Sequence, residues 1–202
     1  MLEINSAPTP RRLVAASNNA HKLAEIRPLL EPAIQILSLQ DIGCHDELPE
    51  TTATLEGNSL QKARYVFDHY GYACFADDTG LEVYALNGAP GVDSAHYAGP
   101  QRSAADNIAL LLNNLEGQLH RGARFRTIIT LVDEQGAVHT FEGIVEGEIT
   151  TEKTGSGGFG YDPVFRPVGY DHTFAQMSID EKNMLSHRGR AVGMLVDFLK
   201  NG

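Results

Sequence analysis

The sequence predicts a mixed α/β or α+β fold, because strand-like and helix-like segments alternate along it and a long hairpin follows them. Apolar side chains recur at helical spacing over residues 21–31 and 58–70. This alternation favours one mixed β-sheet with flanking helices, and 202 residues without a low-complexity linker fit a single domain. Short apolar runs typical of strands occupy residues 13–16, 34–37, 72–76 and 81–85.

The first helix has a recognisable beginning. The strand at residues 13–16 leads into Ser17-Asn18-Asn19, and apolar residues then recur at helical spacing from Leu23 onward. Asn19 is a suitable N-cap, because an asparagine side chain accepts hydrogen bonds from the free N–H groups of a first turn.

The second half of the chain carries a hairpin between two helices. Ser103 precedes an apolar, helix-like stretch. Strands over residues 123–132 and 138–149 flank Glu134-Gln135-Gly136, which is a strong turn signal. A last helix is predicted over residues 190–200.

Charge and composition exclude several functional classes. With 16 Lys and Arg against 26 Asp and Glu, the formal charge is −10, so the chain lacks the cationic surface that long nucleic acids require. Its 42% hydrophobic residues argue against disorder, and no apolar run approaches the roughly 20 residues of a membrane helix. Residues 1–12 lack the apolar core of an export signal, so we expect a cytoplasmic protein. Residues 1–10 form an N-terminal extension whose order the sequence leaves open.

Cysteine and histidine spacing does not predict a transition-metal site. Cys44 and Cys74 lie far apart with no CxxC pattern, and the eight histidines form no HxxxH or HExxH pair. Two thiols in a reducing cytosol are the better interpretation of the cysteines.

The segment Ser17-Asn18-Asn19-Ala20-His21-Lys22 is a candidate anion site. It lies between a strand and a helix, and the first turn of a helix presents unpaired N–H groups and partial positive charge. Lys22 opposes that helix dipole, which makes sense if a phosphate binds there. The alternative is a capped surface helix with a solvated lysine.

Asp77-Asp78-Thr79-Gly80 is the candidate acidic site. We expect the strand to end there in a tight turn, which would put the carboxylates at the open end of a sheet. Neighbouring side chains of a strand point to opposite sides, so one of the pair faces the ligand. Carboxylate oxygens of this kind suit Mg²⁺, and the alternative is a charged turn at a strand end.

Two further segments are rich in features suited to a ligand. Residues 155–162 combine four glycines with Phe159 and Tyr161, whose rings can stack on a flat base. Lys182 and Ser186-His187-Arg188-Gly189 offer hydrogen-bond donors near a helix start. The alternatives are an anchored flexible loop and a solvated basic helix end.

Taken together and in order, these segments resemble the inosine/xanthosine triphosphate pyrophosphatase family, which hydrolyses non-standard purine nucleoside triphosphates. The resemblance spans nearly the whole chain. It rests on Ser17-x-Asn19-x-x-Lys22-x-x-Glu25, Asn58-x-x-x-Lys62-Ala63, Ala76-Asp77-Asp78-Thr79-Gly80-Leu81, Gly88-Ala89-Pro90-Gly91, Gly157-Gly158-Phe159-Gly160-Tyr161-Asp162-Pro163 and Ser186-His187-Arg188.

The resemblance implies an elongated mixed sheet in two lobes around an active-site groove, a homodimer, and dependence on Mg²⁺. It implies that Asp78 is the catalytic acid and, with Glu50, holds the metal. The implied substrate-binding residues are Ser17, Asn18, Asn19, Ala20, His21, Lys22, Lys62, Thr79, Phe159, Gly160, Tyr161, Asp162, Lys182, His187 and Arg188. We expect Lys22, Lys62, Lys182 and Arg188, together with bound Mg²⁺, to make the groove cationic inside an acidic shell.

The implied reaction converts dITP, ITP or XTP and water into the nucleoside monophosphate and pyrophosphate. A related pyrophosphatase for modified pyrimidine or methylated nucleotides, or a sensor that binds nucleotides without turnover, are the alternatives. Three positions depart from the family pattern: Gly57 stands where an acid is usual, His96 replaces an arginine, and His21 replaces a small residue.

Overall fold

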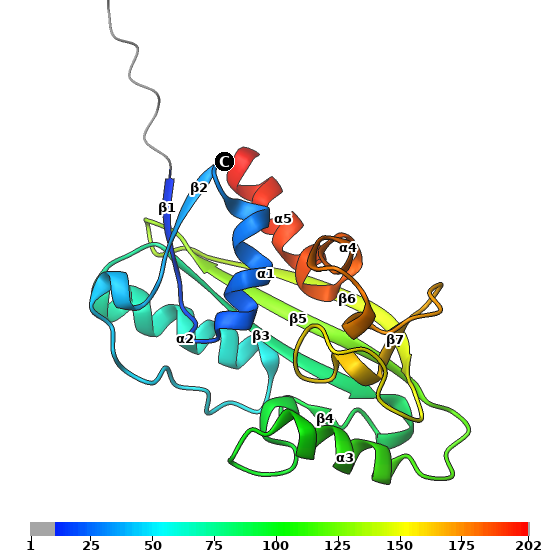
Figure 1. The fold of residues 1–202 in the computed structure, drawn as a ribbon. Coiled ribbons are helices and arrows are strands. Elements are labelled where there is room, and N and C mark those ends of the chain that lie inside the picture. The colour runs from blue at the N-terminus through cyan, green and yellow to red at the C-terminus, as the bar shows by residue number, and fades with distance from the viewer. Residues whose placement is uncertain (1–10, 202) are drawn as a thin grey trace, which may run out of the picture.

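In a computed structural model, which describes residues 11–201, a seven-stranded mixed sheet forms the centre of this part of the protein (Figure 1). Its strands run in the order β2-β1-β3-β5-β6-β7, and the short β4 pairs with β3. β1 is parallel to β2 and β3, and every other pairing is antiparallel, which confirms the predicted mixed fold. The strands are β1 (Arg11–Ala15), β2 (Ile34–Leu37), β3 (Cys74–Val83), β4 (Pro90–Gly91), β5 (Gly122–Val132), β6 (Val138–Ile149) and β7 (Phe165–Pro167).

Helices α1 (Ala20–Leu30) and α5 (His187–Asn201) lie together against the sheet (Figure 1). Ile26 of α1 and Leu195 of α5 are buried in one apolar cluster with Leu13 of β1. Asn19 caps α1 as predicted, since its Oδ1 accepts from the backbone N–H groups of His21 and Lys22 at 3.1 and 3.2 Å.

Helix α5 begins three residues earlier than the predicted residue 190. A short helix, α4 (Ile179–Leu185), which the sequence analysis does not predict, precedes it and is capped by Ser178. As a result His187 and Arg188 belong to the first turn of α5, and Lys182 lies within α4.

Helix α2 (Leu55–Tyr70) packs against β3 and β5, where Ala63 and Val66 lie in a second buried cluster with Val14 and Ala76. It begins three residues before the predicted residue 58, because Thr54 caps it: the Thr54 hydroxyl accepts from the N–H of Gly57 at 3.0 Å. Helix α3 (Ala104–Asn114) begins after Ser103, as predicted, and packs on the far ends of β3 and β5.

The predicted turn at Asp77-Asp78-Thr79-Gly80 is wrong. β3 continues without a break from Cys74 to Val83, and each of its ten residues pairs with β5, Asp77 opposite Ile129 and Asp78 opposite Ile128. The two acids tolerate the middle of a buried strand because both form ion pairs there, as described below. The predicted separate strand at residues 81–85 is therefore the second half of β3, up to Val83.

The remaining predictions concern the hairpin, the cysteines, membrane-spanning helices, residues 1–10 and the division into two lobes. The hairpin between β5 and β6 is confirmed, with Val132 opposite Val138 across its turn. Cys44 and Cys74 are buried free thiols. No helix within residues 11–201 is long and apolar enough to cross a membrane. Residues 1–10 lie outside the described part of the chain, and the division into two lobes stays a prediction.

Candidate active site

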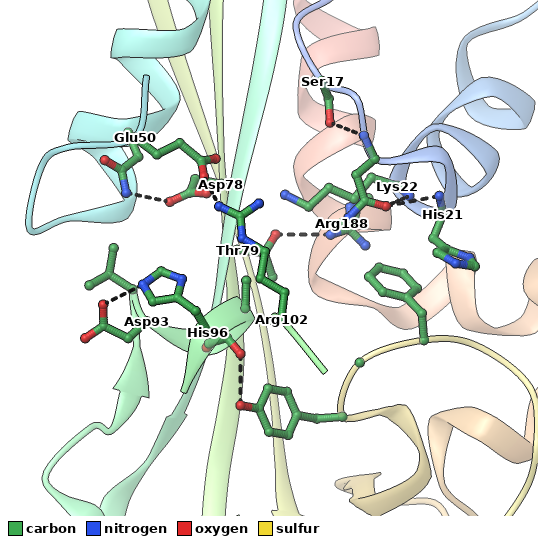
Figure 2. A pocket seen from close by; sticks show the side chains of 18 of the residues that line it. Ser17, His21, Lys22, Glu50, Asp78, Thr79, Asp93, His96, Arg102 and Arg188 are labelled. Atoms are coloured by element: carbon green, nitrogen blue, oxygen red, sulfur yellow. Dashed lines mark hydrogen bonds and ion pairs between the residues drawn. The ribbon is translucent and has the colours of Figure 1, made fainter. Parts of the chain in front are cut away.

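A single groove of about 670 Å³ brings together segments that lie far apart in the sequence (Figure 2). Of the metal- and substrate-binding residues that the family resemblance implies, Ala20 alone does not line it. The others do: Ser17, Asn18, Asn19, His21, Lys22, Glu50, Lys62, Asp78, Thr79, Phe159, Gly160, Tyr161, Asp162, Lys182, His187 and Arg188.

One wall of the groove carries two carboxylates that share a lysine. Lys62 Nζ, from α2, lies 2.5 Å from Glu50 Oε1 and 3.1 Å from Asp78 Oδ1, and it also donates to the carbonyl of Asp77 at 2.8 Å. Burial raises the pKa of Asp78 despite the nearby Lys62 and Lys22. Burial also acts on Glu50, but Lys62 outweighs it and lowers the pKa of that carboxyl. The shared lysine therefore holds the two acids close together.

Asp77 lies on the other side of β3 and does not line the groove. Its Oδ2 contacts Lys22 Nζ at 3.0 Å and Arg188 Nε at 3.3 Å. Burial disfavours the charged form, but Lys22 and Arg188 outweigh it and hold the pKa of Asp77 well below its ordinary range. Only Asp78 of the pair faces the groove, as strand geometry predicts.

The loop before α1 and the glycine-rich loop meet across the groove. The imidazole of His21 stacks on Phe159 with ring centroids 5.3 Å apart and planes inclined by 15°. Asp162 fixes the glycine-rich loop, since its Oδ2 accepts from the N–H of Phe159 at 2.8 Å and from Lys182 Nζ at 2.5 Å. Tyr161 is buried, and its hydroxyl donates to the carbonyl of Ser94 at 2.9 Å. Of the two aromatic side chains of this loop, the buried Tyr161 contributes more to anchoring it, and Phe159 contributes less.

Glu25 is a residue of the site region to which the sequence analysis gives no role. It is buried in α1, and its carboxylate contacts Lys182 Nζ at 2.7 Å and Arg188 Nη1. Its position three residues after Lys22, on the same side of a helix, was the available signal. Burial opposes its charge, but Arg188 and Lys182 lower the pKa of Glu25 below its ordinary value.

The four cations do not by themselves make the groove cationic, and the expectation that they do so together with bound Mg²⁺ stays a prediction. All four cations are paired with carboxylates, because burying a charge without a partner costs too much free energy. Five carboxylates share them: Glu25, Glu50, Asp77, Asp78 and Asp162. The four paired cations supply local donors to a ligand, but no net positive charge.

His187 and Arg188 lie at the floor of the groove. The buried His187 ring stacks on Phe125 with centroids 4.6 Å apart, and its Nδ1 has no hydrogen-bond partner in the described structure. Burial, then the charges of Arg188 and Lys182, lower the pKa of His187 well below 6.5, so it is neutral at pH 7. Arg188 uses its Nη2 to donate to the hydroxyl of Thr79 at 3.1 Å.

The departures from the family pattern fall at different places. There is no room for a side chain at Gly57, because a Cβ at this position would lie 2.3 Å from Thr52 Oγ1. The adjacent Glu56 pairs with Arg126 outside the groove. His96 lines the groove half-exposed and pairs with Asp93 at 3.2 Å.

The residues present fit a magnesium ion better than a metal held by protein alone. Within residues 11–201, no three His, Cys, Asp or Glu side chains come together as a ligand cluster. Mg²⁺ is commonly bound by one or two carboxylates while water and substrate phosphates complete its shell. Glu50 and Asp78 are such a pair, on the wall of an open groove.

Two carboxylates, a helix N-terminus and an aromatic, donor-lined loop around one groove are suited to a small phosphorylated ligand with a flat ring. The chain belongs to the Ham1 family, whose model matches residues 13–198. This confirms the resemblance described above.

Similar proteins cover almost the full chain. A dITP/XTP pyrophosphatase of Flavobacterium psychrophilum is 54% identical over 190 residues, which are 94% of this chain and 100% of that protein. The structure of a HAM1 protein from Coxiella burnetii has a TM-score of 0.87 and 37% identity, and covers 95% of this chain and 100% of its own. A nucleoside-triphosphatase/dITP/XTP pyrophosphatase from Mycobacterium abscessus has a TM-score of 0.75 and 43% identity over 92% of this chain and 98% of its own.

Proposed function

We propose that this protein hydrolyses dITP, ITP and XTP to the nucleoside monophosphate and pyrophosphate, with Mg²⁺, and so removes these nucleotides from the pool. The observation that carries the proposal is the single groove that joins Asp78 of β3, Glu50, the start of α1 and the glycine-rich loop. The relationship to dITP/XTP pyrophosphatases over nearly the full chain supports the choice of substrate.

Asp78 and Glu50 would hold the metal. Bound Mg²⁺ supplies Lewis acidity toward the phosphate oxygens and lowers the pKa of bound water. Asp78 is the acid that orients the attacking water, because it is the carboxylate of β3 that faces the groove. Lys62, between the two acids, stabilises negative charge that develops on the phosphate oxygens during attack.

The start of α1 would bind the triphosphate. The side chain of Asn19 satisfies the N–H groups of His21 and Lys22, so the loop is already ordered before a ligand arrives. Lys22, paired with Asp77 at the back of the groove, adds positive charge beside this helix end.

The base would lie against Phe159, among donors. Lys182 Nζ uses two of its three hydrogens on Glu25 and Asp162, which leaves one for a ligand. A 6-keto purine presents an acceptor to donors such as Lys182, His187 and Arg188, whereas adenine presents an amino donor. Adenine would leave buried donors unsatisfied, so the site should reject it.

The proposal also includes the oligomeric state and the cellular location of the protein. The family resemblance implies a homodimer, which sedimentation of the purified protein would test. We place the reaction in the cytoplasm, where free nucleotides and a reducing environment agree with the buried thiols of Cys44 and Cys74.

The proposed reaction is tested by hydrolysing dITP in H₂¹⁸O, with Mg²⁺ or with EDTA. Attack at the α-phosphorus places one ¹⁸O in dIMP and none in pyrophosphate, and EDTA should abolish turnover. Release of inorganic phosphate and dIDP would contradict the proposal, and so would tight binding of dITP without any product, which is the behaviour of a sensor.

A further inference from the structure

One arginine of the groove is not committed to a close ion pair. Lys22, Lys62, Lys182 and Arg188 each contact a carboxylate within 3.3 Å. Arg102 also lines the groove, but its nearest carboxylate oxygen is Glu50 Oε2 at 3.8 Å, and its side chain is 55% exposed. An exposed pair at this distance contributes little binding energy, so this guanidinium remains available to a ligand.

The backbone holds Arg102 at this place in an uncommon conformation. Its φ of +52° lies in the left-handed region, which non-glycine residues seldom adopt. The surrounding turn fixes it: the N–H of Arg102 donates to Gly99, Gln101 Nε2 donates to the carbonyl of Ala98 at 3.1 Å, and Ser103 caps α3 directly afterwards. Such strain is characteristic of functional positions, and here it accompanies a charged side chain directed into the groove.

We propose that Arg102 binds the phosphate chain of the substrate, in the part that leaves as pyrophosphate. This inference rests on the proposed function. In Figure 2 the Arg102 side chain points toward Glu50, on the wall that carries the proposed metal ligands. The glycine-rich loop proposed to bind the base pairs instead with Lys182, through Asp162. Arg102 therefore faces the phosphates rather than the base.

The balance of charge around the groove gives a reason for an arginine that is not held in a close ion pair. Lys22, Lys62, Lys182 and Arg188 are already shared by five carboxylates, two of which, Glu25 and Asp77, lie behind the lining of the groove, and a triphosphate adds further negative charge. A magnesium ion offsets part of it, and a free guanidinium offsets more while its planar fork binds two phosphate oxygens at once.

The test measures the affinity for inorganic pyrophosphate with Mg²⁺ by calorimetry, and the KM and kcat for dITP. It compares wild type with Arg102→Ala, Arg102→Lys and the control Arg27→Ala, which removes a surface arginine paired with Glu31 on α1. Arg102→Ala should weaken pyrophosphate binding about tenfold and raise KM by a similar factor. Affinity for dIMP should stay within about twofold in every variant. Arg102→Lys should lose less than Arg102→Ala, and Arg27→Ala should match wild type.

Unchanged pyrophosphate affinity in Arg102→Ala would overturn the inference. An equal loss for pyrophosphate and dIMP would overturn it too, because the residue would then act through the shape of the groove. If wild type failed to hydrolyse dITP but bound pyrophosphate through Arg102, the proposed function would be wrong while the anion-binding role of Arg102 would stand.

Discussion

Asp77 and Asp78 follow each other in β3, and the alternation of a strand gives them separate tasks. Asp77 is enclosed with Lys22 and Arg188, whereas Asp78 shares Lys62 with Glu50 on the wall of the groove. The sequence was sufficient to predict that one of them faces the groove. It was not sufficient to predict that the other joins α1 to α5, because that depends on contacts between distant segments.

Replacing Asp78 by Asn should lower kcat for dITP about 10²- to 10⁴-fold, because the amide can neither hold the metal as well nor accept a proton from water. Steady-state kinetics and the thermal midpoint of each variant check this. Asp93→Asn, an exposed carboxylate at the groove rim, is the control and should keep near-normal turnover. Normal turnover in Asp78→Asn would remove the residue from the reaction.

Glu25 is a stabilising residue in our account rather than a catalytic one. Glu25→Gln leaves Lys182 and Arg188 with one buried anion fewer, so we expect the free energy of unfolding to fall by about 3–5 kcal/mol. Urea denaturation measures it. Glu31→Gln, which removes the exposed partner of Arg27 on the same helix, should change stability by less than about 0.5 kcal/mol. Equal stability of the two variants would show that the buried network contributes nothing.

At the scale of elements, capping residues and apolar spacing were enough to locate α1, α2, α3 and the β5–β6 hairpin within a few residues. They failed at β3, because Asp-Asp-Thr-Gly has the local composition of a turn, and only the pairing of every β3 residue with β5 overrides it. They also failed at α4, whose seven residues are too few to show a helical period and depend on the Ser178 cap.

The packing of α5 on β6 supplies the prediction at this scale. A Cβ on Gly143 of β6 would lie 1.9 Å from the carbonyl oxygen of His187 and 2.7 Å from the N of Ala191. Gly143→Ala should therefore push α5 away, cost about 1–3 kcal/mol of stability and reduce activity, because His187 and Arg188 move with the helix.

Gly193→Ala is the matched control for this substitution. Gly193 lies on α5, the helix against which Gly143 packs, and outside the backbone of that helix no atom lies within 4 Å of the added methyl group. Gly193→Ala should therefore be neutral or stabilise the protein by about 0.5–1 kcal/mol. Thermal denaturation and turnover of both variants check the contrast. A Gly143→Ala variant as stable and active as Gly193→Ala would mean that the helix does not need to lie this close.

Across the whole molecule, stability depends on charges and neutral groups buried around the groove. His187 should make that stability sensitive to mild acid. Its pKa is lower in the folded protein than in the unfolded chain, so below about pH 6.5 the unfolded state binds the proton more readily and unfolding becomes easier. One such group contributes up to about 1.4 kcal/mol for each pH unit.

The measurement is the free energy of unfolding between pH 8 and pH 5.5. His187→Gln should show a shallower loss of stability than wild type as the pH falls. Identical slopes for wild type and His187→Gln would contradict the neutral, buried state of this side chain.

The composition of the candidate site could be predicted far better than its charge. Motif order was enough to place all but one of the metal- and substrate-binding residues that the family resemblance implies around the groove. The pairing of each buried cation, the role of Glu25 and the free guanidinium of Arg102 follow from three-dimensional contacts between α1, α4, α5 and the turn before α3. No local pattern encodes those contacts. In our proposal, a metal ion and Arg102 supply the positive charge that a chain of net charge −10 needs to accept a triphosphate.

The most direct test of the central claim is the ratio of kcat/KM values for dITP and XTP against dATP, with dGTP and pyrimidine triphosphates in the same panel. We expect dITP and XTP to be preferred over dATP by about 10²- to 10⁴-fold, because a site that donates to a 6-keto group leaves unsatisfied donors opposite a 6-amino group. Equal turnover of dITP, XTP, dGTP and dATP, or a preference for pyrimidines, would contradict the account.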